Sequence, residues 1–391
     1  MNLRKHLKFI ILIFFSAFIV IAQHDSQISI ITTENANQLE SVASFNPTLG
    51  TDAFYSLTNI EVSKNSKYLV AILSDRRTLE SKIVQIWDIE TSELLTSQTY
   101  EDDIEHFSIS ESGELLALLL REEKLIEDAE GTIIILDIAS GDKVFEQEMM
   151  NIYGLWGISP DNSRLFYTKH ISGQGWESHN IVLDIATGEE TILFQSTGFF
   201  EFSSLQNTFA TTTNTMEVIL WNIDDDNNVT PIQTYEIPSL LAHLAFTPDG
   251  QYLLFKTIMF DIYIASIDSS TYDVYPMGNS VFNYITGYIF PYETEQSETV
   301  LFDIRTKSEI GIVADYILSI HPTNPLVITI HRNESDGTCE YNLSDVTSDT
   351  VLFSWVCEDI SSFTPHIMFT ADGRYVVTTN NDGLVEFWGT E

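Results

Sequence analysis

The sequence predicts an all-β protein built as a single closed β-propeller of four-stranded antiparallel blades. The first observation is a repeated tetrad (an apolar residue, Trp or Leu, Asp or Asn, then Ile), clearest at 86–89, 135–138, 182–185 and 220–223. Its polar position, with decayed copies, recurs about every 43 residues, within the ~40–45 expected for propeller blades. The second is a Pro-Asp-Gly-like turn ahead of the tetrad, between alternating apolar residues. The third is that helical periodicity is nearly absent.

Each repeat is predicted to supply four strands in chain order. An innermost strand leads through the turn to a second strand, the tetrad forms the third, and a Thr-Gly-Glu or Ser-Gly-Asp turn leads to the fourth. Pro presets the first turn angle and Gly accepts a positive φ, so these segments predict hairpins. We expect eight blades, with seven as the alternative because the sixth repeat lacks the turn. The repeats are 52–100, 101–149, 150–196, 197–237, 238–278, 279–314, 315–358 and 359–391.

The N-terminal segment is predicted to close the ring. The last repeat ends after its third strand, at Trp388, and an uncovered sheet edge invites pairing with other chains. Residues 39–45 alternate and belong to no repeat, so we expect them to complete the last blade. The predicted organisation is therefore a signal peptide at 1–22, an N-terminal segment with the closing strand at 23–51, and the propeller at 52–391.

Residues 1–22 have the pattern of a secretory signal peptide. Three basic residues precede an uncharged apolar run that ends in Val-Ile-Ala. At about 14 residues this run is short for a membrane-spanning helix, which needs ~20. We expect a cleaved signal and a secreted or extracytoplasmic protein. An uncleaved N-terminal anchor and retention at the cell envelope are the alternatives.

The chain is strongly acidic, with 57 Asp and Glu against 18 Lys and Arg and a formal net charge of -39. Nucleic-acid binding depends on basic residues that neutralise phosphates, so nucleic acid and anionic membrane surfaces are poor partners. The hydrophobic fraction of 44% is enough to bury a core, so the acidity does not indicate disorder. A surface far from neutrality favours solubility.

These features resemble the WD40-repeat β-propellers, in particular divergent secreted bacterial members. The resemblance rests on the runs at 246–250, 381–388 and 84–88, and on 31–40, which looks like a clasp segment. It implies a rigid, usually non-catalytic scaffold that binds a protein or polymeric ligand without a cofactor, and we expect a monomer. The chain lacks the family's Gly-His pair ahead of the inner strand; His243 lies within that strand instead.

Three long loops between second and third strands form the predicted recognition patch: 75–82, 121–131 and 169–179. In the resembling fold such loops open on the same face as the loops between blades. An exposed aromatic beside Arg is a residue pair that interfaces favour. The alternative is that these are surface loops without function. The candidate binding residues are Arg76, Arg77, Arg121, Lys124, His170, Trp176 and His179.

Cys339 and Cys357 are predicted to form a disulfide. They are symmetric about position 348, near the turn of a predicted hairpin, so they should stand opposite each other on adjacent strands. An exported chain meets oxidising conditions. Two buried free thiols are the alternative.

We predict no catalytic residue and no metal ligand. The chain has no His-Glu-x-x-His or Cys-x-x-Cys zinc signature and no Gly-x-Ser-x-Gly elbow. The acidic run at 224–228 lacks the alternating spacing of a Ca²⁺ loop and is read as a solvated turn. The alternative function is a propeller hydrolase or lactonase with a metal in a carboxylate-lined central channel, because such enzymes draw groups from several blades.

Overall fold

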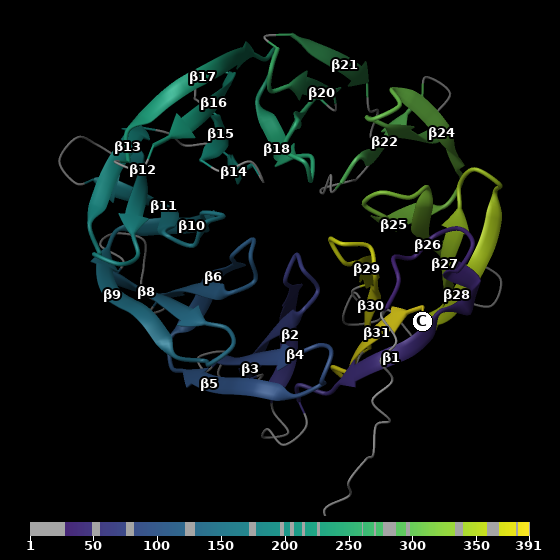
Figure 1. Ribbon diagram of the computed structural model, residues 1–391, viewed down its shortest axis with the longest axis horizontal. Coiled ribbons are helices and arrows are strands. Elements are labelled where there is room, and N and C mark those ends of the chain that lie inside the picture. The colour runs from purple at the N-terminus through teal and green to yellow at the C-terminus, as the bar shows by residue number, and fades with distance from the viewer. Residues whose placement is uncertain are drawn as a thin grey trace, which may run out of the picture.

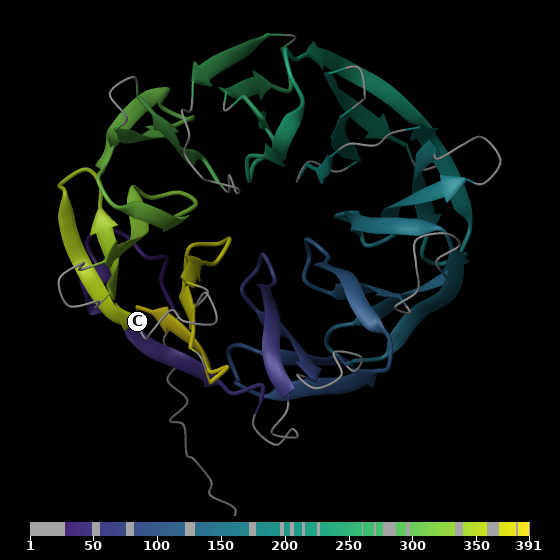
Figure 2. The same cartoon turned by 180° about the vertical axis from the view of Figure 1, so that it is seen from behind.

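The computed structural model is a ring of eight antiparallel sheets around a central axis (Figure 1). The prediction of an all-β propeller with eight blades is confirmed, and the only helix among the described residues is the short 3-10 helix η1 (Ala36–Gln38). Figure 2 shows the same closed ring from behind. The described residues are 28–48, 55–75, 82–121, 130–171, 177–195, 199–203, 207–212, 216–224, 227–259, 261–269, 271–276, 287–294, 298–332, 339–357, 367–380 and 382–390.

The blades follow the predicted repeats in chain order. Blade 1 comprises β2 (Tyr55–Val62), β3 (Tyr68–Asp75), β4 (Lys82–Asp88) and β5 (Leu94–Tyr100); blade 2 comprises β6 (Asp103–Ile109), β7 (Leu115–Arg121), β8 (Glu130–Asp137) and β9 (Lys143–Met150). Blade 3 comprises β10 (Ile152–Ile158), β11 (Arg164–Ile171), β12 (Glu177–Asp184) and β13 (Glu190–Gln195); blade 4 comprises β14 (Phe200–Phe202), β15 (Thr208–Thr212), β16 (Glu217–Ile223) and β17 (Val229–Glu236). Blade 5 comprises β18 (Leu241–Phe246), β19 (Tyr252–Thr257), β20 (Asp261–Ser266) and β21 (Tyr272–Pro276); blade 6 comprises β22 (Ile289–Glu293), β23 (Thr299–Asp303) and β24 (Ser308–Val313). Blade 7 comprises β25 (Tyr316–Ile320), β26 (Leu326–Arg332), β27 (Cys339–Asp345) and β28 (Thr350–Cys357); blade 8 comprises β29 (Ile367–Phe369), β30 (Val376–Thr379), β31 (Val385–Gly389) and β1 (Glu40–Phe45).

Within each complete blade the strands pair antiparallel with their neighbours. Turns between first and second strands and between third and fourth strands therefore lie at one face of the ring, which we call the hairpin face. Loops between second and third strands and between blades lie at the opposite face, which we call the loop face. The described candidate residues of the predicted recognition patch, Arg121, His170 and His179, lie toward the loop-face ends of their strands.

Blade 6 resolves the choice between seven and eight blades. Its three described strands, β22 to β24, form a sheet of their own. The third strand of the predicted repeat, with its polar position at Asp303, is β23. Residues 277–286, where the innermost strand of this repeat is expected, lie outside the described residues.

The N-terminal segment closes the ring, as predicted. β1 pairs antiparallel with β31 from Glu40 opposite Gly389 to Phe45 opposite Val385. Before β1, the Ile31 amide donates to the carbonyl of Gly373 at 2.9 Å, and the Ile31 side chain is fully buried. An N-terminal and a C-terminal segment thus share the last blade.

The core consists of apolar layers between neighbouring blades, supplied by the second and third strands. The tetrad tryptophans pack in these layers. The indole N–H of Trp221 donates to Thr211 at 2.8 Å, and that of Trp388 donates to Thr378 at 3.1 Å. A buried indole needs such an acceptor, and the second strand provides it.

A buried hydroxyl organises the turn between the first two strands of most blades. In blade 1 the Ser63 hydroxyl accepts a hydrogen bond from the Tyr68 amide at 2.9 Å, and in blade 5 Thr247 accepts from the Tyr252 amide at 3.0 Å. Gly250 has a φ of 66, so the positive φ predicted for this turn is confirmed. Ser or Thr occupies the position at 63, 110, 159, 203, 247 and 370.

Blade 7 places His321 at this turn position. The fully buried imidazole accepts at Nδ1 from the amides of Thr323 at 3.1 Å and Asn324 at 3.0 Å. Nε2 therefore carries the proton and donates to the carbonyl of Gly373 in blade 8 at 3.1 Å. Burial lowers the pKa of His321 to about 4, so the ring is neutral and structural.

Candidate functional site

The predicted recognition patch is only partly within the described residues. Arg76, Arg77, Lys124 and Trp176 lie outside them. Arg121, His170 and His179 are described, and the structure places all three in strands. The expected third loop, 169–179, was too long: β11 continues to Ile171 and β12 begins at Glu177, because the strand pairing extends to those residues.

Arg121 joins two blades. Its guanidinium forms an ion pair with Glu105 on the neighbouring β6, with Nη1 and Oε2 at 2.8 Å, and also donates to the carbonyl of Ile152 in blade 3. Two other basic residues of these loops are also paired, Lys82 with Asp103 at 3.0 Å and Lys169 with Glu190 at 2.9 Å. These cations neutralise acids of the ring itself.

The two histidines do not converge on one site. His170 stands opposite Ser178, and its Nδ1 lies 3.3 Å from the Ser178 hydroxyl. His179 stands opposite Lys169, the residue before His170. Successive strand residues point to opposite faces of a sheet, so the two imidazoles lie on opposite sides of blade 3.

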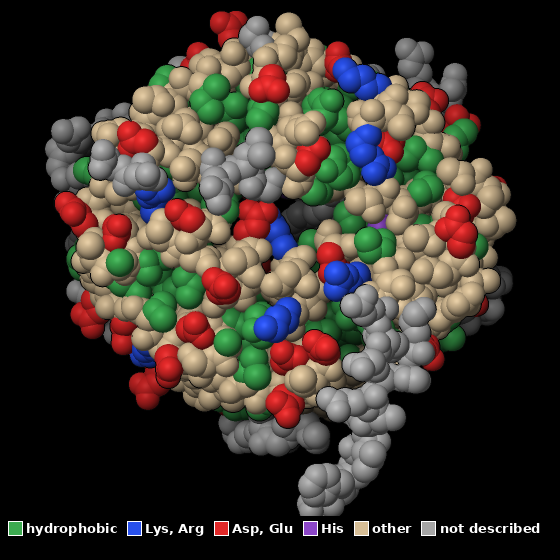
Figure 3. Space-filling model, in the orientation of Figure 1, with side chains coloured by type: hydrophobic (Ala, Val, Ile, Leu, Met, Phe, Trp, Pro, Cys, Tyr) green, Lys and Arg blue, Asp and Glu red, His purple; other side chains and the backbone are tan. Residues whose placement is uncertain are grey.

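A cavity of about 520 Å³ opens on the axis at the hairpin face; we call it the channel mouth. It is lined by the ends of inner strands β2, β14, β18, β25 and β29 and by the turns that follow the inner strands. In the space-filling view the centre of the disc is hollowed, and acidic side chains outnumber basic ones on the face shown (Figure 3). The mouth combines groups from seven of the eight blades, and these groups are far apart in the chain.

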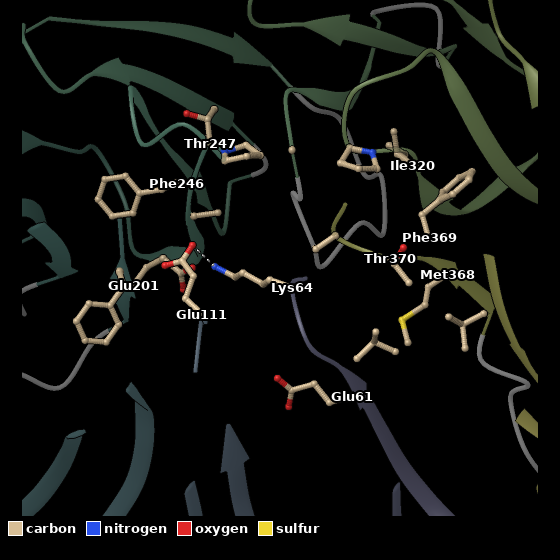
Figure 4. Close-up of a pocket in the computed structure, with 18 of the residues that line it drawn as sticks. Glu61, Lys64, Glu111, Glu201, Phe246, Thr247, Ile320, Met368, Phe369 and Thr370 are labelled. Atoms are coloured by element: carbon tan, nitrogen blue, oxygen red, sulfur yellow. Dashed lines mark hydrogen bonds and ion pairs between the residues drawn. The ribbon is translucent and has the colours of Figure 1, made fainter. Parts of the chain in front are cut away.

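One side of the mouth is acidic. Glu61 at the end of β2, Glu111 in the turn of blade 2 and Glu201 in β14 line it together with Lys64 (Figure 4). Lys64 Nζ and Glu111 Oε1 form an ion pair at 3.1 Å. The three carboxyl groups thus share one ammonium group.

Glu61 and Glu201 are carboxyl groups held partly out of water. Burial raises the pKa of Glu61 to about 7, although its Oε1 accepts a long hydrogen bond of 3.4 Å from the Ile109 amide. Burial also raises the pKa of Glu201 to about 7; the Glu111 charge adds to this, and Lys64 opposes it. No hydrogen bond or ion pair satisfies Glu201 among the described residues. Both groups therefore change charge near neutral pH.

The other side of the mouth is apolar. Ile320 in β25 and Met368 and Phe369 in β29 line it across from Glu111 and Glu201, and Glu61 lies between the two sides (Figure 4). Phe246 lies on the side of Glu201. The Phe369 ring packs edge-on against the buried His321 ring at 5.0 Å, which fixes this wall. The mouth is a two-sided, amphipathic cavity of a size that suits a small ligand.

Sequence reasoning missed the mouth because its residues lie far apart in the chain. The signal was present in the repeat register. Two residues before the turn hydroxyl or imidazole, blades 1 to 5 carry Glu61, Ser108, Gly157, Glu201 and Ala245, and blades 7 and 8 carry Ser319 and Met368. One residue after it stand Lys64, Glu111, Pro160, Pro248, Pro322 and Ala371. Aligning the repeats on the hydroxyl would have predicted two rings of side chains around the channel.

A cation from the preceding blade contacts Asp224 and Asn227 of the acidic run at 224–228. Arg164, which is buried, donates from Nε to Asn227 Oδ1 at 2.6 Å and from Nη2 to the carbonyl of Asp224 at 2.8 Å. The turn was expected to be merely solvated. Among the described residues no group of three His, Cys, Asp or Glu side chains is placed to hold a metal ion.

The cysteine register agrees with the prediction. Cys339 in β27 stands directly opposite Cys357 in β28. The register shifts between Leu343 and Ser344, where β28 holds one extra residue; without this bulge Cys339 would face Val356. The disulfide itself stays a prediction.

No family model matches the chain, and none of the curated proteins matches it. Among solved structures the chain is similar to the crystal structure of the Myceliophteria thermophila Cps50 (Swd1) β-propeller domain. The two are 12% identical, the match covers 90% of this chain and 100% of that chain, and the TM-score is 0.49. We draw no conclusion from this similarity, since strand pairing alone establishes the fold.

The described part of the chain contains no helix long and apolar enough to cross a membrane.

Proposed function

We propose that this protein is a non-catalytic binding module whose ligand site is the channel mouth on the hairpin face. The observation that carries the proposal is a preformed cavity of about 520 Å³ in which the Glu201 carboxyl has no hydrogen-bond or ion-pair partner among the described residues. A buried polar group without a partner is costly, and a ligand can supply the missing partner. The proposed site lies on the opposite face from the predicted recognition patch.

The same proposal includes export and kinship with divergent secreted WD40-like propellers. Residues 1–22, which lie outside the described residues, support export through their basic start and apolar run. The acidic surface suits an exported soluble protein. N-terminal sequencing of the mature protein tests this part: a chain that starts after about residue 22 supports it, and an intact Met1 contradicts it.

A propeller hydrolase with a metal-bearing channel is the rival. The mouth does line its channel with carboxylates from several blades, as that rival requires. However, two of the three carboxyl groups hold a proton up to about pH 7 because they are buried. Below that pH a proton competes with a metal ion for these groups, and at any pH a metal ion would leave the apolar side of the mouth without contacts, so we favour an organic ligand.

A screen of chemically diverse fragments tests the binding module. We expect a saturable rise in melting temperature with some fragments, because a ligand that binds only the folded state stabilises it. Ala371→Trp should abolish this rise: Ala371 is exposed and lines the mouth, so the larger side chain fills the cavity without disturbing the core. Bound fragments should be recovered chemically unchanged. A screen without any saturable response, or responses that survive Ala371→Trp, would contradict the proposed site.

A further inference from the structure

The two walls of the channel mouth make unlike demands on a ligand. The acidic wall holds Glu61, Glu111 and Glu201, and Lys64 is the one Lys or Arg among the described lining residues. The facing wall of Ile320, Met368 and Phe369 offers no polar side-chain group. A ligand that fills the cavity must therefore satisfy carboxyl groups at one end and tolerate an apolar surface at the other.

The acidic wall lacks cations of its own. Lys64 is engaged with Glu111 at 3.1 Å, and its side chain is 57% exposed. Glu201 has no ion-pair or hydrogen-bond partner among the described residues, and Glu61 has only the long contact with the Ile109 amide. An incoming positive charge would relieve the repulsion between Glu201 and Glu111 and pair with a carboxylate shielded from bulk water, where the attraction is stronger.

The apolar wall rules out other ligand classes. An anion would meet three carboxyl groups. A small metal ion would leave Met368 and Phe369 without contacts, and a purely apolar ligand would bury the carboxyl groups without partners, which is unfavourable. Only a molecule with both a cationic and an apolar part satisfies both walls.

We propose that the channel mouth binds an organic ammonium ion that carries an apolar group, with the ammonium paired with Glu201 on the acidic side and the apolar group on the side of Met368 and Phe369. This inference rests on the proposed function for the location of the site. A free arylalkylamine and the N-terminus of a peptide that begins with an aromatic residue present the same chemistry. Lys64 acts as an internal competitor, because its ammonium already occupies Glu111.

The test measures three probes that share a phenethyl group by calorimetry on the mature chain: phenethylamine, its close isostere phenethyl alcohol, and phenylpropionate. We expect the amine to bind at least about tenfold more tightly than the other two at about pH 8, where Glu61 and Glu201 are ionised. Glu201→Gln should weaken binding of the amine by about tenfold and leave binding of the alcohol unchanged, because the substitution removes the charge and keeps the shape of the side chain. Lys64→Gln should strengthen binding of the amine, because it removes the competing ammonium group.

The matched control is Glu93→Gln. Glu93 is an exposed residue in the turn between β4 and β5, on the same hairpin face but outside the cavity. Glu93→Gln removes the same charge as Glu201→Gln. If it weakens binding of the amine equally, only the general negative field of the protein matters, and that result would overturn the inference. Met368→Ala should weaken amine and alcohol alike, since it acts on the apolar part.

Two peptides distinguish the sources of the ligand. If Phe-Gly-Gly binds as tightly as phenethylamine and its acetylated form does not, the mouth accepts peptide N-termini; if only the free amine binds, the ligand is a small molecule, and both results support the inference. Equal binding of alcohol and amine would overturn it but, if lost in Ala371→Trp, would leave the proposed function intact. No binding of any probe up to about 10 mM would also overturn it.

Discussion

Replacing Glu201 by Gln should stabilise the protein above neutral pH and leave its stability unchanged in acid. The folded-state pKa of Glu201 is raised from 4.5 to about 7 by burial, with Glu111 raising it further and Lys64 opposing this. Between these two pH values the folded state holds a proton that the unfolded state releases. The stability that comes with this proton is fully present below about pH 4.5 and is lost as the pH rises through about 7.

The full shift corresponds to roughly 3 kcal/mol. Glu201 is partly exposed, so water that reaches the carboxylate reduces the penalty, and we expect about 1–2 kcal/mol at pH 8. Gln has the same shape and cannot ionise, so Glu201→Gln avoids the penalty. Its melting temperature should exceed that of the wild type by a few degrees at about pH 8 and match it at about pH 4.5.

The assay is calorimetric unfolding of wild type, Glu201→Gln and the exposed control Glu93→Gln across this pH range. The control should show no pH-dependent gain, because its carboxylate is exposed and outside the cavity. If Glu201→Gln instead lowers the melting temperature most at high pH, the carboxylate is stabilised by its surroundings. That result would refute both the raised pKa and the shortage of cations at the mouth.

Three further predictions concern the ring itself. Ile31→Asp should cost about 3 kcal/mol or more, because it places a charge in the fully buried position ahead of the closing strand; an unchanged melting temperature would contradict this role of the clasp. Cys339→Ser should cost about 2–4 kcal/mol if a disulfide joins Cys339 and Cys357, and peptide mapping that finds both thiols free ends that prediction. His321→Phe should cost about 2–4 kcal/mol by leaving two amides without an acceptor. The pKa of His321 is lowered to about 4 in the folded state, so the His321 ring should cost the wild type stability as the pH falls below about 6.5. His321→Phe should lack this loss, and calorimetry at about pH 7 and about pH 5 can show the difference.

The fold could be predicted because its determinants repeat. The tetrad strand recurs often enough that even the decayed copy at Asp303 kept its place as the third strand of blade 6. The incomplete last repeat and the spare alternating segment before Phe45 together fixed the closure, because an open sheet edge has to be covered. Cys339 stands opposite Cys357 only because of a bulge after Leu343, and the sequence gives no sign of this bulge. The agreement with the predicted pairing, which assumed a symmetric hairpin, is therefore partly a coincidence.

The candidate site could not be found by the same route. Loop length and local charge predicted a patch that includes Arg121 and His170. In the structure, strand pairing continues into the third predicted loop, and Arg121 forms an ion pair with a neighbouring strand. The residues of the mouth lie about one or several repeats apart, so only a closed ring brings Glu61 and Glu201 to the same cavity. A sequence scan for compact motifs is blind to sites of this kind.

The contrast between two positions in the repeat shows how the ring separates stability from function. The turn position is a Ser or Thr in six blades, because the hydroxyl must accept the amide that begins the second strand; in blade 7 the His321 imidazole accepts nearby amides instead. Two residues earlier the side chain does not hold the turn, and the residue ranges from Gly157 to Glu201 and Met368; Glu201 and Met368 line the channel mouth. Small residues there leave space, carboxyl groups supply charge and Met supplies an apolar surface. The channel mouth can therefore change its ligand without changing the ring, and the cation preference proposed for it depends mainly on Glu201 at this repeat position.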